Sequence, residues 1–117
     1  MRRDNKRVSK IQEARTARDF GGRTTPASGS QWHSKGDVKT NNWLIECKTT
    51  SKLSYSLKAE TWHKIWTEAI SEGRDPIMVL DFETEGVSLV VMSKEDFLGI
   101  VNMGDYRELN ESIGIKA

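Results

Sequence analysis

The sequence predicts one α/β (α+β) domain in which helices flank a mixed central sheet. Its length of 117 residues is close to the common size of a single domain. Helix-like and strand-like segments follow one another in the order α-β-β-β-α-β-β-α, the pattern of a layered fold built around a sheet. The continuous apolar run at residues 77–80 is typical of a strand buried on both faces.

The first helix is predicted over residues 5–20. Apolar side chains recur along it at about three-residue spacing: Val8, Ile11, Ala14, Ala17 and Phe20. The Gly-Gly pair at residues 21–22 ends the helix. Residues 23–28 then have the character of a short extended segment, and Pro26 favours an edge position for it.

Two further strands are predicted at residues 36–40 and 43–50. The Asn-Asn pair at residues 41–42 lies between them and suits a hairpin turn. The polar residues 51–56 follow as a loop.

The clearest helical pattern comes after this loop. Its apolar residues recur at the i, i+3, i+4, i+7 and i+8 positions of one helix face: Trp62, Ile65, Trp66, Ala69 and Ile70. We expect Ser56 to cap the start of this helix and Gly73 with Pro76 to close it. Trp62 and Trp66, one helical turn apart, are interpreted as core residues, with base stacking as the alternative.

The strand at residues 77–80 turns back into another strand at residues 87–92. Ser93, with Asp96 three residues later, forms a capping box that opens a last helix over residues 94–103. The pattern of the polar tail beyond this helix supports no further element.

Charge is distributed unevenly along the chain. Residues 1–64 hold 14 Lys and Arg against 6 Asp and Glu, a balance of +8, while residues 65–117 hold 4 against 11, a balance of −7. Such segregation indicates one basic face, suited to a polyanion, and one acidic face. Scattered solvated charges are the alternative.

Composition also limits the expected cellular setting. No apolar run approaches the ~20 residues needed to cross a bilayer, so no membrane partner is expected. The basic N-terminus has no apolar segment behind it and does not resemble a secretory signal. The single cysteine, Cys47, can form no internal disulfide, which favours a reducing cytoplasm, and it is interpreted as a small core residue.

Asp37, Glu46 and Lys48 are the candidate catalytic residues. Because side chains alternate along a strand, Glu46 and Lys48 share one face about 7 Å apart, while Ile45 and Cys47 point into the core. Asp37 lies on the preceding strand, so the three polar groups can converge on one divalent cation and one water molecule. A simple ion pair between Glu46 and Lys48 on a solvated sheet face is the alternative.

The chemistry of these groups suits Mg²⁺, with Mn²⁺ as a substitute. Mg²⁺ is a hard cation that prefers oxygen ligands, which Asp37 and Glu46 would supply, and the main-chain carbonyl of Cys47 is a further candidate ligand. The metal would polarise a phosphate and lower the pKa of a bound water. Lys48 would orient that water or offset charge on the phosphate oxygens. The pattern therefore predicts metal-assisted cleavage of a phosphodiester bond.

The Gly-Asp pair at residues 36–37, followed by Leu-Ile-Glu-Cys-Lys at residues 44–48, resembles the signature of the PD-(D/E)xK nuclease superfamily. Gly takes the place of the superfamily's Pro before the Asp. The α-β-β-β-α-β order matches that superfamily's restriction-endonuclease-like core. Within it, residues 26–30 and the Trp-rich helix resemble archaeal-type and phage Holliday junction resolvases. The similarity covers about residues 8–82, and residues 83–117 add a strand and a helix that do not map onto the minimal resolvase.

This resemblance implies a single nuclease domain over residues 1–117. Its parts are a basic N-terminal arm and helix at about residues 1–20, a core at about residues 8–82 and a C-terminal extension at residues 83–117. The resemblance also implies a homodimer that introduces paired nicks into a four-way DNA junction with Mg²⁺. The expected location is the cytoplasm of a prokaryotic cell or of a phage-infected host.

Residue by residue, the resemblance places the metal carboxylates on Asp37 and Glu46 and the catalytic lysine on Lys48. It adds Glu13, on the first helix, as a further acidic residue that reaches the metal; a solvated helix charge is the alternative. Ser30 matches the serine that these resolvases carry before the Asp, or it simply shapes the turn.

Basic residues are the candidate DNA contacts, because phosphate contacts position DNA and steepen the salt dependence of binding without reading sequence. Arg15 and Arg23 match residues that hold the DNA backbone in the resolvases. The whole candidate set is Arg15, Arg18, Arg23, Ser30, Lys35, Lys39, Lys52 and Lys64. His33 and His63 lack partners at zinc-ligand spacing, so zinc is not expected. Trp32 has two open interpretations, stacking on DNA and packing.

The sequence therefore predicts a Mg²⁺-dependent, structure-selective DNA endonuclease that resolves Holliday junctions. Two alternatives remain open. One is another PD-(D/E)xK-type nuclease, restriction-like, repair or nicking, that acts on linear or branched duplex. The other is a DNA-binding module without catalytic activity.

Overall fold

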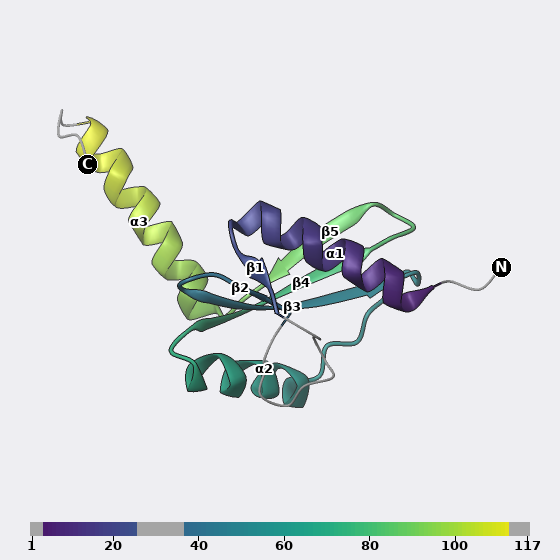
Figure 1. Cartoon of the computed structure of the whole chain (residues 1–117). Helices are drawn as coiled ribbons and strands as arrows, with labels where there is room; N and C mark the ends of the chain where they lie inside the picture. The colour runs from purple at the N-terminus through teal and green to yellow at the C-terminus, as the bar shows by residue number, and fades with distance from the viewer. Residues whose placement is uncertain (1–3, 26–36, 113–117) are drawn as a thin grey trace.

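The computed structural model describes residues 4–25 and 37–112, and its elements follow the predicted order (Figure 1). They are α1 (Asn5–Phe20), β1 (Arg23–Thr24), β2 (Val38–Lys39), β3 (Trp43–Thr50), α2 (Ala59–Ser71), β4 (Asp75–Phe82), β5 (Val87–Val91) and α3 (Lys94–Ser112). The prediction of an α+β fold with a mixed sheet flanked by helices is confirmed.

The five strands form one sheet in the order β1-β2-β3-β4-β5. β3 and β4 are parallel, and every other neighbouring pair is antiparallel. A parallel pair needs a crossover connection, which α2 supplies between β3 and β4. α1 lies on one face of the sheet and α2 on the other (Figure 1). β1 is at the sheet edge, as predicted for that segment, although Pro26 lies outside the described residues.

The core on the α1 side of the sheet confirms the alternation predicted for β3. Val38, Ile45, Ile77 and Val79 are at most 5% exposed and form one buried cluster. Five partly buried apolar side chains pack against it from α1, β3 and the end of β5: Ala17, Phe20, Trp43, Cys47 and Met92. Residues 77–80 of β4 are all at most 7% exposed, so this strand is buried on both faces as predicted.

The face that α1 turns to the sheet differs from the predicted apolar stripe. Gln12 and Thr16 are buried, whereas Ile11 is 54% exposed. Gln12 can be buried because its side-chain Nε2 donates to the main-chain oxygens of Lys48, at 2.6 Å, and Val79, at 3.3 Å. These hydrogen bonds to strand carbonyls thus offset the cost of burying the N–H groups of the amide.

Two predictions for α2 are wrong. The helix begins at Ala59 after Lys58, without a side-chain cap, so Ser56 lies too early to cap it. Trp66 is 44% exposed and is not a core residue. Ile65 and Ala69 are the buried residues of this helix. Trp66 lies to one side of the helix face that carries these two residues.

α3 runs to Ser112, well past the predicted end at residue 103. The predicted cap is present, since Ser93 Oγ accepts a hydrogen bond from the Asp96 main-chain N–H at 3.0 Å. Gly104 does not end the helix, because Gly weakens a helix by only about 1 kcal/mol relative to Ala. α3 projects away from the body of the molecule (Figure 1). Although it has 19 residues, neither α3 nor another helix in the described ranges is apolar enough to span a bilayer.

Candidate active site

The β2–β3 hairpin brings the three predicted catalytic residues together. Asp37 precedes β2, and its main-chain N–H donates to the Ile45 oxygen at 3.0 Å. Its Oδ2 accepts a hydrogen bond from the Cys47 main-chain N–H at 2.8 Å. The Asp37 carboxylate therefore lies against the backbone of β3, between Ile45 and Cys47 and beside Glu46.

Glu46 and Lys48 form an ion pair on the opposite side of β3 from the α1 core. Lys48 Nζ lies 3.4 Å from Glu46 Oε1, and the two side chains are 38% and 22% exposed respectively. Because Ile45 and Cys47 belong to the α1 side, Glu46 and Lys48 point to the α2 side. The pair is thus half buried rather than a solvated surface pair.

The surroundings of Glu46 disfavour the ionised form of its carboxyl group. Its pKa rises from 4.5 to about 7, mainly because the group is buried and then because Asp37 is negatively charged; Lys48 acts in the opposite direction. Added positive charge would stabilise the ionised form of two neighbouring carboxylates in a half-buried site. A divalent cation would supply this charge and would displace a proton on binding.

Lys48 is held as an ammonium ion. Burial, the largest single influence, lowers the pKa of Lys48, but the charges of Glu46, Tyr55 and Asp37 together outweigh it, and the pKa is raised. Lys48 is therefore suited to stabilise negative charge and not to accept a proton. The Cys47 thiol is inert, because burial raises its pKa to about 12.

A metal ion at this site would have two carboxylate ligands. Asp37 and Glu46 provide hard oxygen donors of the kind that Mg²⁺ prefers, so the residues fit this ion. Over residues 4–25 and 37–112, no group of three or more His, Cys, Asp or Glu side chains is placed to hold a metal ion. Glu13 does not complete such a group with the two carboxylates. The remaining ligands would be water, phosphate oxygens and main-chain carbonyls, for which that of Cys47 stays a candidate.

Three residues beside the site were not predicted. Gln12 anchors the main chain of Lys48 to α1. The Thr16 hydroxyl is hydrogen-bonded to the Cys47 thiol, and Tyr55, in the loop after β3, interacts electrostatically with Lys48. Gln12 and Thr16 are spaced one helical turn apart, but both are polar. The prediction from the spacing of apolar residues therefore could not identify them.

Seven of the eight predicted DNA contacts fall into three groups. Arg18, Arg23, Lys52 and Lys64 are exposed. Lys39 is held within the fold, since its Nζ lies 2.5 Å from Glu72 Oε1 and its side chain is only 15% exposed. Ser30 and Lys35, together with Trp32 and His33, lie outside the described residues.

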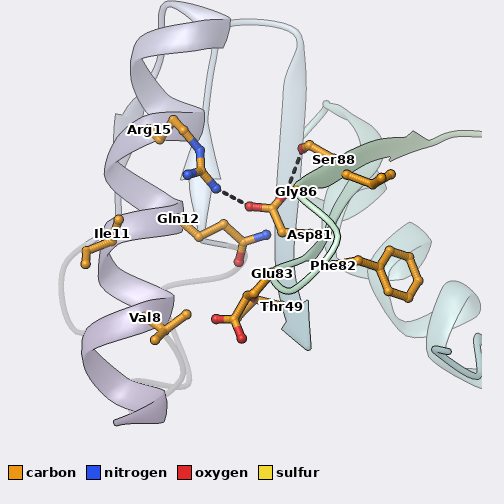
Figure 2. A pocket seen from close by; sticks show the side chains of 11 residues that line it. Val8, Ile11, Gln12, Arg15, Thr49, Asp81, Phe82, Glu83, Gly86 and Ser88 are labelled. Carbon is orange, nitrogen blue, oxygen red and sulfur yellow. Dashed lines mark hydrogen bonds and ion pairs between the residues drawn. The ribbon is translucent and has the colours of Figure 1, made fainter. Parts of the chain in front are cut away.

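Arg15 forms an ion pair with Asp81, whose other oxygen accepts a hydrogen bond from the Ser88 hydroxyl at 2.6 Å (Figure 2). This contact lies at a pocket of about 300 Å³ between α1 and the β4–β5 turn. The pocket is on the α1 side of the sheet and is separate from Glu46 and Lys48. Arg15 thus links α1 to Asp81 of β4, while about half of the Arg15 side chain stays exposed.

Comparisons of the chain with protein-family models, curated protein sequences and solved structures find no match.

Proposed function

We propose that the protein is a Mg²⁺-dependent DNA endonuclease with a restriction-endonuclease-like core, which resolves four-way junctions as a homodimer. The observation that carries this proposal is the Asp37 carboxylate, bonded to the Cys47 N–H at 2.8 Å beside the Glu46–Lys48 pair. Two close carboxylates and a charged lysine are the groups that metal-assisted phosphodiester cleavage needs.

In the proposed mechanism, Asp37 and Glu46 would hold the metal. When bound, Mg²⁺ would polarise the scissile phosphate and lower the pKa of a water molecule. Lys48 remains protonated and stabilises the charge that builds on the phosphate oxygens. Gln12 keeps the Lys48 main chain in place from the other side of the strand. Attack in line with the leaving oxygen gives a 5′-phosphate and a 3′-hydroxyl, as the resemblance to these nucleases implies.

The charge distribution supports DNA as the substrate. The half of the chain that carries the site has a balance of +8, and its exposed Arg18, Arg23, Lys52 and Lys64 are available for phosphate contacts. Selectivity for a junction would come from the shape of the DNA and the spacing of two sites in a dimer, since a two-fold axis matches the near two-fold symmetry of the junction.

The test is cleavage of a four-way junction and of its separate linear arms by the purified chain, with Mg²⁺ or with a chelator. Glu46→Ala and Lys48→Ala are each expected to slow junction cutting by at least about 10²- to 10³-fold and to leave junction binding intact. Glu60→Ala and Lys94→Ala, at exposed positions on α2 and α3, are the matched controls.

Each other result has a definite meaning. Equal cutting of the linear arms would identify a different nuclease of the PD-(D/E)xK type. Junction binding without Mg²⁺-dependent cutting by the unaltered chain would identify a DNA-binding module. Full activity of Glu46→Ala would exclude the proposed site.

A further inference from the structure

Glu68 is an acidic residue at an unfavourable position of α2. It lies in the last turn of the helix, where the helix dipole disfavours a negative charge, and its side chain is partly buried. Among the described residues, no Lys or Arg forms an ion pair with Glu68. Glu72, one turn later, has such a partner in Lys39, at 2.5 Å. The stability of the helix therefore does not explain a carboxylate at position 68.

The direction in which Glu68 points follows from that of Glu72. Because Glu72 contacts Lys39 of β2, its flank of α2 faces β2 and the neighbouring β3. Residues four positions apart lie on the same flank of a helix. Glu68 therefore faces the same two strands, which agrees with its partial burial.

The level of Glu68 along the sheet follows from the register of the strands. Lys39 pairs with Leu44, so Glu72 lies close to the level of Leu44 on β3. α2 connects the parallel strands β3 and β4 and runs back against their direction. One turn back along α2 is about 5.4 Å, and two residues forward along β3 are about 7 Å. Glu68 and Glu46 are therefore at nearly the same level.

Glu68 and Glu46 also point toward each other. The Glu46 side chain points to the side of the sheet that α2 covers (Figure 1). In agreement with this geometry, the negative charges of Asp37 and Glu68 both contribute to the raised pKa of Glu46. When all three carboxyl groups are ionised, they face the single ammonium of Lys48, which leaves an excess of two negative charges. One divalent cation would neutralise that excess.

We propose that Glu68 is a positioning residue that accepts hydrogen bonds from water molecules around a divalent cation held by Asp37 and Glu46. In this respect the inference rests on the proposed function. Glu68 acts through water, because no three carboxylates of the described residues are placed to bind one metal ion directly. The resemblance assigned a third carboxylate to Glu13 instead. Glu13 belongs to α1, on the opposite face of the sheet, where its charge acts on Cys47.

The chemistry of Mg²⁺ suits such a residue. Mg²⁺ loses its water molecules reluctantly and usually keeps several of them when it binds a protein. Residues that hold the first ligands of a metal in place typically change its affinity by about 10- to 100-fold. Glu68 is therefore expected to affect metal binding itself, before any DNA is present.

The test is the binding of Mn²⁺ to the full chain without DNA, measured by the electron paramagnetic resonance signal of free Mn²⁺. At about pH 8 the carboxyl groups are mostly ionised. Glu68→Gln is expected to raise the Kd for Mn²⁺ by about 10- to 100-fold. Glu68→Asp keeps the charge and is expected to lose less affinity. Glu60→Gln, at an exposed position of the same helix, is the matched control and should change the Kd by less than about twofold.

Urea denaturation with a chelator separates this role from a structural one. Glu68→Gln removes a carboxylate that faces Glu46 and opposes the helix dipole, so it is expected to unfold at a higher urea concentration than the unaltered chain. A residue that only stabilises the fold would give the opposite change. Lower stability of Glu68→Gln without metal would therefore overturn the inference.

Two results of the Mn²⁺ titration would also overturn it. One is an equal Kd for Glu68→Gln and Glu60→Gln, and the other is a larger loss of affinity in Glu13→Gln than in Glu68→Gln. In both cases the unaltered chain still binds Mn²⁺, so the proposed function stands. Absence of Mn²⁺ binding by the unaltered chain would instead contradict the proposed function and this inference with it.

Discussion

The β2–β3 hairpin and the β5–α3 segment differ in which kind of side chain they bury and which they expose. In the hairpin, polar groups are half buried and each has a partner within the chain, as in the Asp37–Cys47 hydrogen bond and the Glu46–Lys48 ion pair. In the β5–α3 segment, apolar groups such as Phe97 and Ile100 are about half exposed. Residues 1–64, which include the hairpin, have a charge balance of +8, and residues 65–117 have one of −7.

This difference separates two roles. The hairpin holds the charged groups of Asp37, Glu46 and Lys48 close together in a half-buried place. Such an arrangement is energetically unfavourable and is typical of a reactive site. The C-terminal segment leaves apolar area uncovered, which is typical of an association surface. Three measurements test whether this difference is real.

The largest expected effect on stability is that of Gln12→Glu. It places a carboxylate against the Lys48 and Val79 main-chain oxygens, so the free energy of unfolding should fall by about 3 kcal/mol near neutral pH. Urea denaturation measures this. Ile11→Glu, at the exposed neighbouring position, should change stability by less than about 0.5 kcal/mol. Equal effects of the two substitutions would show that Gln12 does not anchor the site strand.

The next effect concerns Glu46→Gln and pH. The pKa of Glu46 is raised to about 7 in the fold, so its contribution to stability is fully present below about pH 4.5 and is lost as the pH rises through about 7. Glu46→Gln cannot ionise and should gain roughly 1–3 kcal/mol relative to the unaltered chain between about pH 5 and pH 8.

Urea denaturation at both pH values, with a chelator present, measures this gain. Glu60→Gln, at an exposed position of α2, is the control and should follow the unaltered chain. A Glu46→Gln variant with the same pH dependence as the unaltered chain would contradict the electrostatic description of the site.

The smallest effect is that of Arg18→Ala on DNA binding. Arg18 is exposed, so its loss should lower the slope of log K against log salt by about one unit without affecting stability. Arg15→Ala should instead lower stability, because Arg15 pairs with the buried Asp81. Salt titrations of junction binding by both variants measure this, and an unchanged slope for Arg18→Ala would place the DNA elsewhere.

The local parts of the fold could be predicted because their signals lie in short segments. The hairpin at residues 41–42, the buried strand at residues 77–80 and the Ser93 cap each depend on a few neighbouring residues. The grouping of Asp37, Glu46 and Lys48 follows from the same hairpin, since strand alternation and one turn suffice to place them.

The predictions failed where contacts between residues far apart in the sequence determine which side chains are buried. The predicted stripe of α1 failed at Ile11, because Gln12 finds carbonyl partners 36 and 67 residues away. The sequence also did not predict that Arg15, assigned to DNA by the resemblance, and Lys39, assigned by its charge, pair with Asp81 and Glu72 far along the chain. A count of charges contains no information about such pairings.

Local periodicity and turn chemistry were sufficient to predict the order of the elements, the alternation of β3 and the proximity of Asp37, Glu46 and Lys48. Packing between distant segments determines which polar residues of α1 are buried, that Trp66 is exposed and that β5 and α3 leave apolar side chains uncovered. Burial is a property of the whole packed molecule: a side chain is covered only if a distant segment lies over it, and no short pattern specifies that.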